Sequence, residues 1–245
     1  MYQNRTYRNL VNTGNLIPFK VTVKETDLHI HAEKNLESTS RELILRYRGY
    51  LESYIKRNPE FVKTLNPWYI DTPEPVIIQE MAEAGRKAGV GPMAAVAGAI
   101  AEHVGKGLLA HTSEVVVENG GDIFLKKDNP VTIAIFAGKS PLSLKTGLQI
   151  DPGDSPVSVC TSSGTVGHSL SMGRADAICV VSKSCPLADA VATSMGNRIN
   201  LQSDIKKAID FGKSIEGVTG LVAIMGNSIG AWGELEIIPL KGKKG

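Results

Sequence analysis

Two apolar segments joined by a glycine turn constrain the fold of this chain most. Residues 114–117 are largely β-branched, residues 123–125 are apolar, and Glu118-Asn119-Gly120-Gly121-Asp122 lies between them. This pattern is typical of a β-hairpin, because strands joined by a short turn pair antiparallel. Further strands are expected at residues 21–32 (a strand or hairpin arm), 131–137, 156–160, 177–182, 220–225 and 234–238. Residues 178–181 are uniformly apolar, which indicates a strand buried on both faces.

The expected helices come in blocks between these strands. Thr39-Ser40-Arg41-Glu42 fits a capping box and opens a helix to residue 57, and residues 75–89, 187–198 and 204–214 are further helices. Residues 90–101 carry no charge and predict a helix buried on all sides, which Glu102 and His103 return to solvent. Residues 140–156 and the glycine-rich segment around Trp232 are expected as connections. The blockwise order predicts an α+β fold, a mainly antiparallel sheet with flanking helices, as a single domain over residues 1–245.

Charge and composition exclude several classes of protein. Lys and Arg number 27 against 25 Asp and Glu, a net charge of +2, which is too balanced for a protein that binds nucleic acid through its phosphates. The first residues lack the apolar core of a signal peptide, and no apolar run has membrane-spanning length. Three cysteines, an odd number, argue against a disulfide framework. We therefore expect a cytoplasmic protein without a membrane partner, and a homo-oligomer stays open.

His29 and His31 lie two residues apart and would share one face of a strand. Two histidines at this spacing can bind a metal, but no third ligand with supporting spacing lies nearby in the sequence. An exposed polar face is therefore the favoured interpretation, and the pair is left out of the candidate site.

The segment after Cys160 is the first candidate for chemistry. It is rich in hydroxyl side chains and glycines, which can surround a ligand with O–H and N–H donors: Thr161, Ser162, Ser163, Gly164, Thr165, Gly167, Ser169, Ser171 and Gly173. A phosphate or pyrophosphate is the natural ligand, although the segment matches neither the phosphate-loop pattern nor the dinucleotide-binding glycine pattern. His168 lies within it, either as a catalytic acid or base or as a residue that braces the loop.

Asp189 and Thr193 are four residues apart in a segment predicted to be helical, so they share one helix face. Carboxylate and hydroxyl oxygens suit Mg²⁺, which takes few protein ligands and completes its shell with water and phosphate. By spacing alone, a capping Asp and a Thr bonded to its own backbone are the more common outcome. The helix near residue 96 likewise has two interpretations, tight packing or free N–H groups aimed at a ligand.

Cysteine chemistry supplies an alternative function. Cys160 precedes the hydroxyl-rich segment and Cys185 precedes the helix that carries Asp189. A helix N-terminus lowers a thiol pKa, so either residue could serve a thiol-dependent sulfur-handling protein. Buried structural cysteine is the competing interpretation.

Three blocks together resemble a known superfamily: residues 118–122, residues 161–168, and Ala188-Asp189-Ala190-Val191-Ala192-Thr193. They are similar to those of the ApbE superfamily, the FAD:protein FMN transferases. From residue 5, through Val90-Gly91-Pro92-Met93, to residue 233, the chain more closely resembles an uncharacterised-protein-family branch of that superfamily.

This resemblance implies an α+β fold, FAD as ligand or substrate, and Mg²⁺ bound by Asp189 and Thr193. It also implies that the nucleotide is lined by Asn119, Gly120, Gly121, Asp122, Thr161, Ser162, Ser163 and Gly164. In such an enzyme, Mg²⁺ bridges the pyrophosphate, the hydroxyl of a threonine on an acceptor protein receives FMN, and AMP is released.

Two departures from the transferases are visible. They carry a Lys-Gly-Tyr-x-x-Asp segment on the helix before the Gly-Gly turn, and the comparable helix here reads Gly98-Ala99-Ile100-Ala101-Glu102-His103. They follow the histidine with an Asp-Pro element, and this chain has residues 169–174, Ser-Leu-Ser-Met-Gly-Arg. We therefore expect altered substrate recognition, and a non-catalytic ligand-binding module on the same fold is a further alternative.

Overall fold

Eight strands form one continuous sheet in the computed structural model, which describes residues 14–164, 173–233 and 235–240. Every neighbouring pair in it is antiparallel. In spatial order the strands are β1 (Ile17–Val23), β2 (Thr26–Ala32), β3 (Val115–Asn119), β4 (Asp122–Lys126), β7 (Val157–Ser162), β8 (Ala177–Ser182), β9 (Val218–Met225) and β10 (Ser228–Gly233). A second sheet has the order β11 (Glu236–Pro239), β6 (Thr146–Ile150), β5 (Val131–Ala134).

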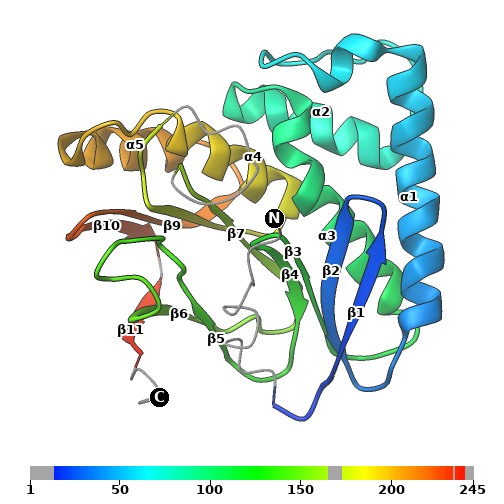
Figure 1. The fold of residues 1–245 in the computed structure, drawn as a ribbon, viewed down its shortest axis with the longest axis horizontal. Coiled ribbons are helices and arrows are strands. Elements are labelled where there is room, and N and C mark those ends of the chain that lie inside the picture. Colours follow the sequence, from blue (N-terminus) through cyan, green and yellow to red (C-terminus); the bar gives the residue numbers. More distant parts are fainter. Residues whose placement is uncertain (1–13, 165–172, 234, 241–245) are drawn as a thin grey trace.

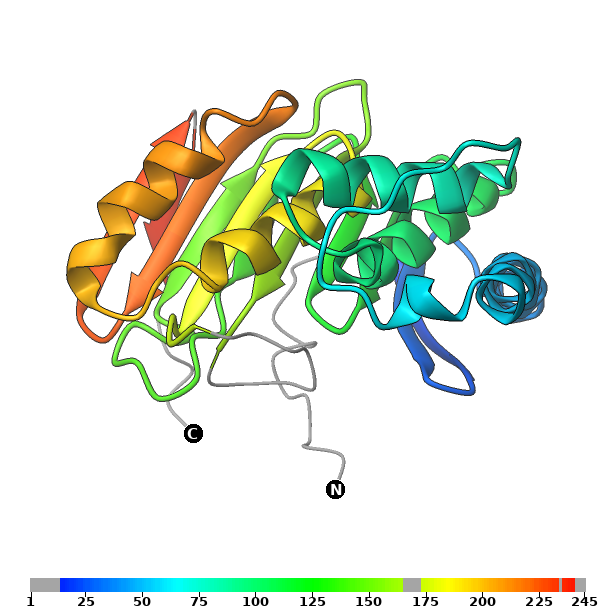
Figure 2. The ribbon, with the colours of Figure 1, turned by 90° about the horizontal axis from the view of Figure 1, so that it is seen from above.

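Helices cover one face of the large sheet, and the small sheet lies on the other side (Figures 1 and 2). The helices are α1 (Glu37–Arg57), α2 (Val76–Ala88), α3 (Val96–Leu108), α4 (Cys185–Gly196) and α5 (Ile205–Gly212). Short 3₁₀ turns occur at η2 (Pro59–Val62), η3 (Pro92–Ala95) and η4 (Gln202–Asp204). The predicted α+β class with a mainly antiparallel sheet is thereby confirmed.

Strand alternation produces two cores from one sheet. On β3 and β4, Val117 and Phe124 pack in the core under the helices, whereas Val116 and Leu125 pack in the core next to the small sheet. Successive side chains of a strand point to opposite faces, so a strand covered on both sides must be apolar throughout. This accounts for β8, whose six residues are all buried, as its sequence predicted.

Several helix and strand boundaries differ from those predicted. The segment 21–32 contains the β1–β2 turn, where Lys24 has a φ of 51°. The helix α1 begins at Glu37 with Leu36 as N-cap and no side-chain cap bond, so the expected capping box at residues 39–42 lies inside the helix. The buried helix over residues 90–101 is in fact η3 followed by α3, which continues to Leu108.

Two segments that the sequence predicted to be connections contain strands. β6 lies within residues 140–156, and β10 contains the glycine-rich segment with Trp232. Both carry several glycine or polar residues, and they become strands because a neighbouring strand offers hydrogen-bonding partners.

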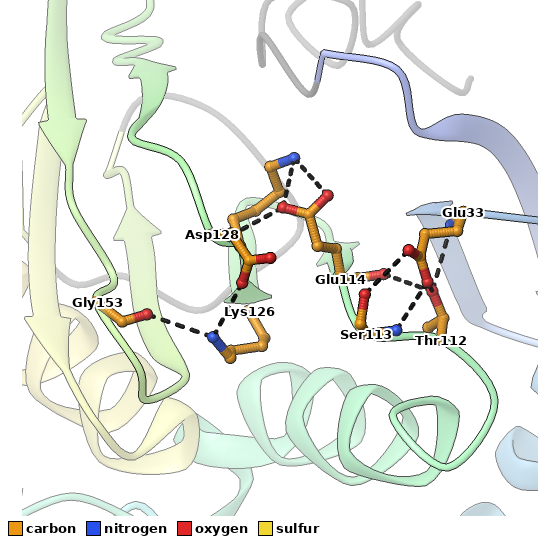
Figure 3. A network of polar contacts seen from close by, with 8 residues as sticks. Glu33, Thr112, Ser113, Glu114, Lys126, Asp128 and Gly153 are labelled. Atoms are coloured by element: carbon orange, nitrogen blue, oxygen red, sulfur yellow. Dashed lines mark hydrogen bonds and ion pairs between the residues drawn. The ribbon is translucent and has the colours of Figure 1, made fainter.

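A polar network closes one end of the large sheet (Figure 3). Glu33, just after β2, accepts hydrogen bonds from the Thr112 hydroxyl (2.8 Å) and from the Ser113 N–H (2.8 Å) before β3. Glu114 pairs with Lys127 beyond β4 at 3.0 Å. These contacts join the start of β3 to the end of β4, which is the end of the hairpin opposite its Gly-Gly turn.

The histidines of β2 differ in environment. His29 is half-buried, but His31 is only 8% exposed, and its Nδ1 has no hydrogen-bond partner among the described residues. Burial, and after it the charge of the neighbouring His29, lowers the pKa of His31 to about 4. The exposed polar face predicted for both residues is therefore wrong for His31.

None of the described helices combines the length and apolarity needed to cross a membrane.

Candidate functional site

The structure brings parts of the three sequence blocks together at one end of the central strands. The β3–β4 turn and the last residues of β7 are adjacent, because Asp122 is in register with Cys160 and the Thr161 N–H donates to the Gly121 carbonyl at 3.2 Å. Helix α4 packs on β7 and on α3. Residues from three distant parts of the sequence thus converge beside the first turn of α3.

The β3–β4 turn has the backbone that its glycines predict. Gly120 and Gly121 have φ values of 69° and 117°, a region in which residues with a Cβ are strained. The Glu118 carboxylate accepts a hydrogen bond from the Gly121 N–H at 2.9 Å. The Asn119 amide donates to the Ala97 carbonyl at 3.0 Å, so this predicted nucleotide-binding side chain links the turn to the start of α3.

Asp189 points from α4 at the first turn of α3. It is 9% exposed, and its carboxylate accepts a hydrogen bond from the Gly98 N–H at 2.9 Å. Ala97 contributes a second backbone hydrogen bond. The first N–H groups of a helix have no partner within the helix and favour an anion. Of the two interpretations of this helix start, tight packing describes the structure, since α3 packs closely on α4 and its first N–H groups bind a carboxylate of the chain itself instead of pointing freely at a ligand.

Gly98 is what permits this approach. A Cβ at residue 98 would lie 2.5 Å from the Cys185 carbonyl oxygen and 3.0 Å from the Asp189 Cβ. Both contacts are far shorter than van der Waals separation. A side chain at residue 98 would therefore force α3 and α4 apart and carry Asp189 with α4.

Asp122 and Asp189 form a pair of buried acids. Burial raises the pKa of Asp189 to about 7, against the opposing effect of its backbone hydrogen bonds. Burial, followed by the charge of Asp189, raises the pKa of Asp122 well above its usual range, and the charge of Glu118 acts in the same direction. Two nearby carboxylates in a low-dielectric site ionise together only when a cation offsets their repulsion, and otherwise one of them keeps its proton.

This acid pair tests whether Mg²⁺ suits the site. Asp189 keeps a small exposed fraction, and Thr193 is half-buried one helical turn further along α4. Within residues 14–164, 173–233 and 235–240, no three His, Cys, Asp or Glu side chains are grouped to hold a metal ion. A site with Asp189, Thr193 and ligand phosphate as donors needs no such group, because Mg²⁺ keeps several water ligands. The residues present fit Mg²⁺ on these grounds.

The hydroxyl-rich segment is divided between the two faces of the sheet. Cys160 lies in the core under the helices, whereas the Thr161 hydroxyl contacts the Cys179 sulfur at 3.3 Å, in the core on the small-sheet side. By alternation Ser162 faces the helix side, as Asp122 does. The structure therefore brings Ser162 to the Asp189 side and takes the Thr161 side chain away from it.

The next two candidates follow the end of β7. Ser163 is half-buried, and Gly164 donates its N–H to the Ala175 carbonyl at 2.9 Å. A Cβ at Gly164 would collide with the Gly173 carbonyl oxygen, so these two glycines are in close backbone contact. His168, the candidate acid or base, lies outside the described residues.

Glu102 is a buried residue of this region that the sequence interpretation missed. It is 3% exposed, its Oε2 accepts a hydrogen bond from the Cys185 N–H at 2.5 Å, and Lys106 donates to its Oε1 at 2.5 Å. His103 is also buried and contacts Glu80 at 2.7 Å. The expected return of α3 to solvent at these residues is wrong. The only signal in the sequence was the i,i+4 spacing of Glu102 and Lys106.

Cys160 and Cys185 are buried together. The sulfur atoms of Cys160 and Cys185 are 3.5 Å apart, and neither residue is exposed. Burial raises the pKa of both thiols, including Cys185, for which a helix N-terminus predicted a lowered pKa. A buried protonated thiol is a poor nucleophile. This geometry favours the interpretation of structural cysteines over sulfur transfer.

Comparisons with known proteins show the family of this chain. A model of the family described as AbpE bacteria matches residues 8–230. A UPF0280 protein of Methanocella arvoryzae is 42% identical over 217 residues, 88% of each chain, and one of Methanococcus aeolicus is 38% identical over 226 residues, 90% of this chain and 91% of the relative.

Solved structures show the same fold at low identity. The flavin transferase ApbE from Vibrio cholerae has a TM-score of 0.57 and 14% identity, covering 89% of this chain and 96% of its own. The apo flavinyl transferase ApbE from Pseudomonas stutzeri has a TM-score of 0.58 and 12% identity, covering 89% and 94%.

Proposed function

This chain belongs to the AbpE bacteria family and shares the fold of the ApbE flavin transferases, and on that premise we propose that it binds FAD, or a similar pyrophosphate nucleotide, with Mg²⁺. We further propose that it transfers FMN to an acceptor protein in the cytoplasm. The resemblance predicted from the three sequence blocks is confirmed by the family match, whereas ligand, metal and activity are proposals.

The buried pair Asp122 and Asp189 is the observation that carries this proposal. Burying two carboxylates near each other costs free energy, and the backbone hydrogen bonds that Asp189 accepts from α3 offset this cost only in part. A site that receives Mg²⁺ and a nucleotide diphosphate gives the pair a role, because the cation offsets both the protein carboxylates and the pyrophosphate. The raised pKa of each acid is the sign of that cost.

Each site residue would have a distinct role in binding. Asp189 and Thr193 would hold Mg²⁺, which when bound would withdraw charge from the pyrophosphate oxygens. The β3–β4 turn, residues 119–122, would position the nucleotide with its backbone, and Ser162 and Gly164 would approach it from the end of β7. The α3 N-terminus, through Gly98, would keep Asp189 in one orientation.

In the transfer, an acceptor hydroxyl oxygen forms a bond to the phosphorus of the FMN half. The bond between that phosphorus and the bridging oxygen breaks, and AMP leaves with the bridging oxygen. The hydroxyl proton passes to a base, for which His168 is the candidate.

Calorimetric titration of FAD into the protein, with and without Mg²⁺, tests the binding proposal. We expect binding that requires Mg²⁺ and that weakens about tenfold or more in Asp189→Asn. Asp154→Asn, an exposed acid in a loop, is the matched control and should bind as the native protein does. Undetectable binding in the presence of Mg²⁺, or binding unchanged in Asp189→Asn, would contradict the proposal.

A binding module without transfer is the second candidate, and the buried Glu102 favours it. The transferases resembled by this chain carry a Lys-Gly-Tyr-x-x-Asp segment on the comparable helix. Residues 98–103 lack that segment here, and Glu102 within them binds the Cys185 N–H and Lys106. Incubation with FAD, Mg²⁺ and threonine-containing acceptor peptides separates the two. Release of AMP with an FMN mass increase on the peptide supports transfer, and Mg²⁺-dependent binding without AMP supports the module.

A further inference from the structure

The strand β10 forms an open edge of the large sheet. It pairs with β9 on one side and is the last strand in the spatial order of the described residues (Figure 1). Its sequence, Ser-Ile-Gly-Ala-Trp-Gly, contains neither a charge nor a proline. Soluble proteins usually place charged residues or prolines on an edge strand, because the unpaired N–H and C=O groups of that strand can pair with another strand.

The opposite edge shows the protection that β10 lacks. The strand β1 carries Pro18 and Lys20, and Lys24 follows in its turn. A proline removes a backbone donor, and a lysine must be desolvated before another strand can pair. The two edges of one sheet therefore differ in the feature that controls strand addition.

A groove lined by both apolar and polar residues runs alongside β10. It has a volume of about 430 Å³ and lies between α5 and the strand. Figure 2 shows α5 lying over β10 at one edge of the large sheet. Ile205 and Ile209 line its helix side. Ile229 on the strand is 44% exposed, and its side chain points to the other face of the sheet, because the neighbouring Gly230 faces α5. Trp232 is 37% exposed on the same strand. Apolar surface thus accompanies the free backbone groups.

We propose that β10 is the interface for a second copy of this chain, with the two β10 strands paired antiparallel about a twofold axis. The large sheet would then continue from one copy into the other. Helix α5 packs on β9 and β10, so the two α5 helices would lie on the same side of the joined sheet. With strands about 4.8 Å apart, the helices would be separated by about two strand spacings, roughly 10 Å. That is the separation of packed helices.

Charges on the groove favour this occupant. Lys206 and Asp210 both line the groove and lie one helical turn apart on α5. Asp210 also pairs with Lys213 of the same chain at 2.7 Å, and both Asp210 and Lys213 remain partly exposed. Gly230 is level with the middle of this turn, since a Cβ on it would lie 2.5 Å from Ile205 and 3.7 Å from Ile209. A twofold axis near Gly230 reverses the second helix, which brings Lys206 of each copy toward Asp210 of the other. The surface is therefore complementary to itself, as a twofold interface requires.

Sedimentation velocity of the full chain over a range of concentrations tests the proposal. We expect a monomer–dimer equilibrium that Ile229→Lys shifts to monomer, whereas Ile17→Lys, at an exposed position of β1, leaves it unchanged. Lys206→Glu and Asp210→Lys should each raise the dimer Kd by roughly tenfold, and the double variant should restore it.

Circular dichroism of each variant distinguishes loss of pairing from loss of folding. Monomers at every concentration, or a dimer that resists both Ile229→Lys and the single charge reversals, would overturn the proposal. A dimer that Ile17→Lys weakens as much as Ile229→Lys would also overturn it, because the interface would then involve β1.

Discussion

Replacing Gly98 by alanine gives a direct test of how α3 and α4 are joined. The new methyl group would lie 2.5 Å from the Cys185 carbonyl oxygen, 2.8 Å from its carbon and 3.0 Å from the Asp189 Cβ. Two of these three atoms belong to backbone, and no side-chain rotation removes the contact. Helix α4 must therefore shift, and the hydrogen bond from the Gly98 N–H to the Asp189 carboxylate must lengthen or break.

Two opposing terms set the size of the effect. Alanine is favoured over glycine in a helix by at most about 1 kcal/mol. Overpacking in a closely packed core costs about 1–3 kcal/mol, and more when backbone must move. We expect a net loss of about 1–2 kcal/mol in the free energy of unfolding. Gly49→Ala is the matched control, because Gly49 lies within α1 and, apart from the backbone of its own helix turn, no atom lies within 4 Å of the position its new methyl group would take. This variant should gain about 0.5–1 kcal/mol.

Urea unfolding followed by circular dichroism measures both variants, and an unchanged m-value shows that the unfolded state is comparable. Under the proposed function, Gly98→Ala should also weaken Mg²⁺-dependent FAD binding, whereas Gly49→Ala should not. If Gly98→Ala stabilises the chain as Gly49→Ala does, the close packing of α3 on α4 is refuted.

Three further predictions concern other buried groups. The pKa of His31 in the folded chain, about 4, lies below its usual 6.5, so the unfolded chain binds the proton more tightly. Allowing for solvent screening, the free energy of unfolding should therefore fall by up to about 2 kcal/mol as the pH drops from 6.5 through 4. Urea unfolding of His31→Gln should show a smaller fall over the same pH range. Glu102→Ala should lower the free energy of unfolding by about 2–3 kcal/mol, because the Cys185 N–H loses its charged acceptor, and Lys106→Met should cost less. Alkylation of the native chain should leave Cys160 and Cys185 unmodified until denaturant is added, and rapid labelling by mass spectrometry would instead favour thiol chemistry.

Local patterns in the sequence predicted much of the fold. The uniformly apolar run of β8, the Gly-Gly turn between β3 and β4, and the glycine after α2 each depend on neighbours a few residues away. Steric limits on φ and the periodicity of side chains act at that range. The fold class followed from the order of these elements, although the capping box at residues 39–42 shows that a local motif can lie inside a longer helix.

Part of the candidate site was also predictable. Asp189 and Thr193 were selected by spacing together with the family resemblance, and their assignment to Mg²⁺ stays a prediction. The Asn119 and Thr161 side chains were expected to line a nucleotide, but one bonds to Ala97 and the other contacts Cys179 on the far face of the sheet. Which face a residue takes depends on strand register, and the sequence alone left that register open.

The sequence by itself determined most of the elements, the antiparallel class and the family of this protein, since these depend on local conformational preference and on motif identity. Only the tertiary structure decided that Asp122 and Asp189, far apart in the chain, share one buried environment, that Glu102 turns inward to Cys185, and that β10 is an open edge among the described strands. Burial and charge coupling depend on distances through space. Those distances exist only once α3, α4 and the sheet have packed together.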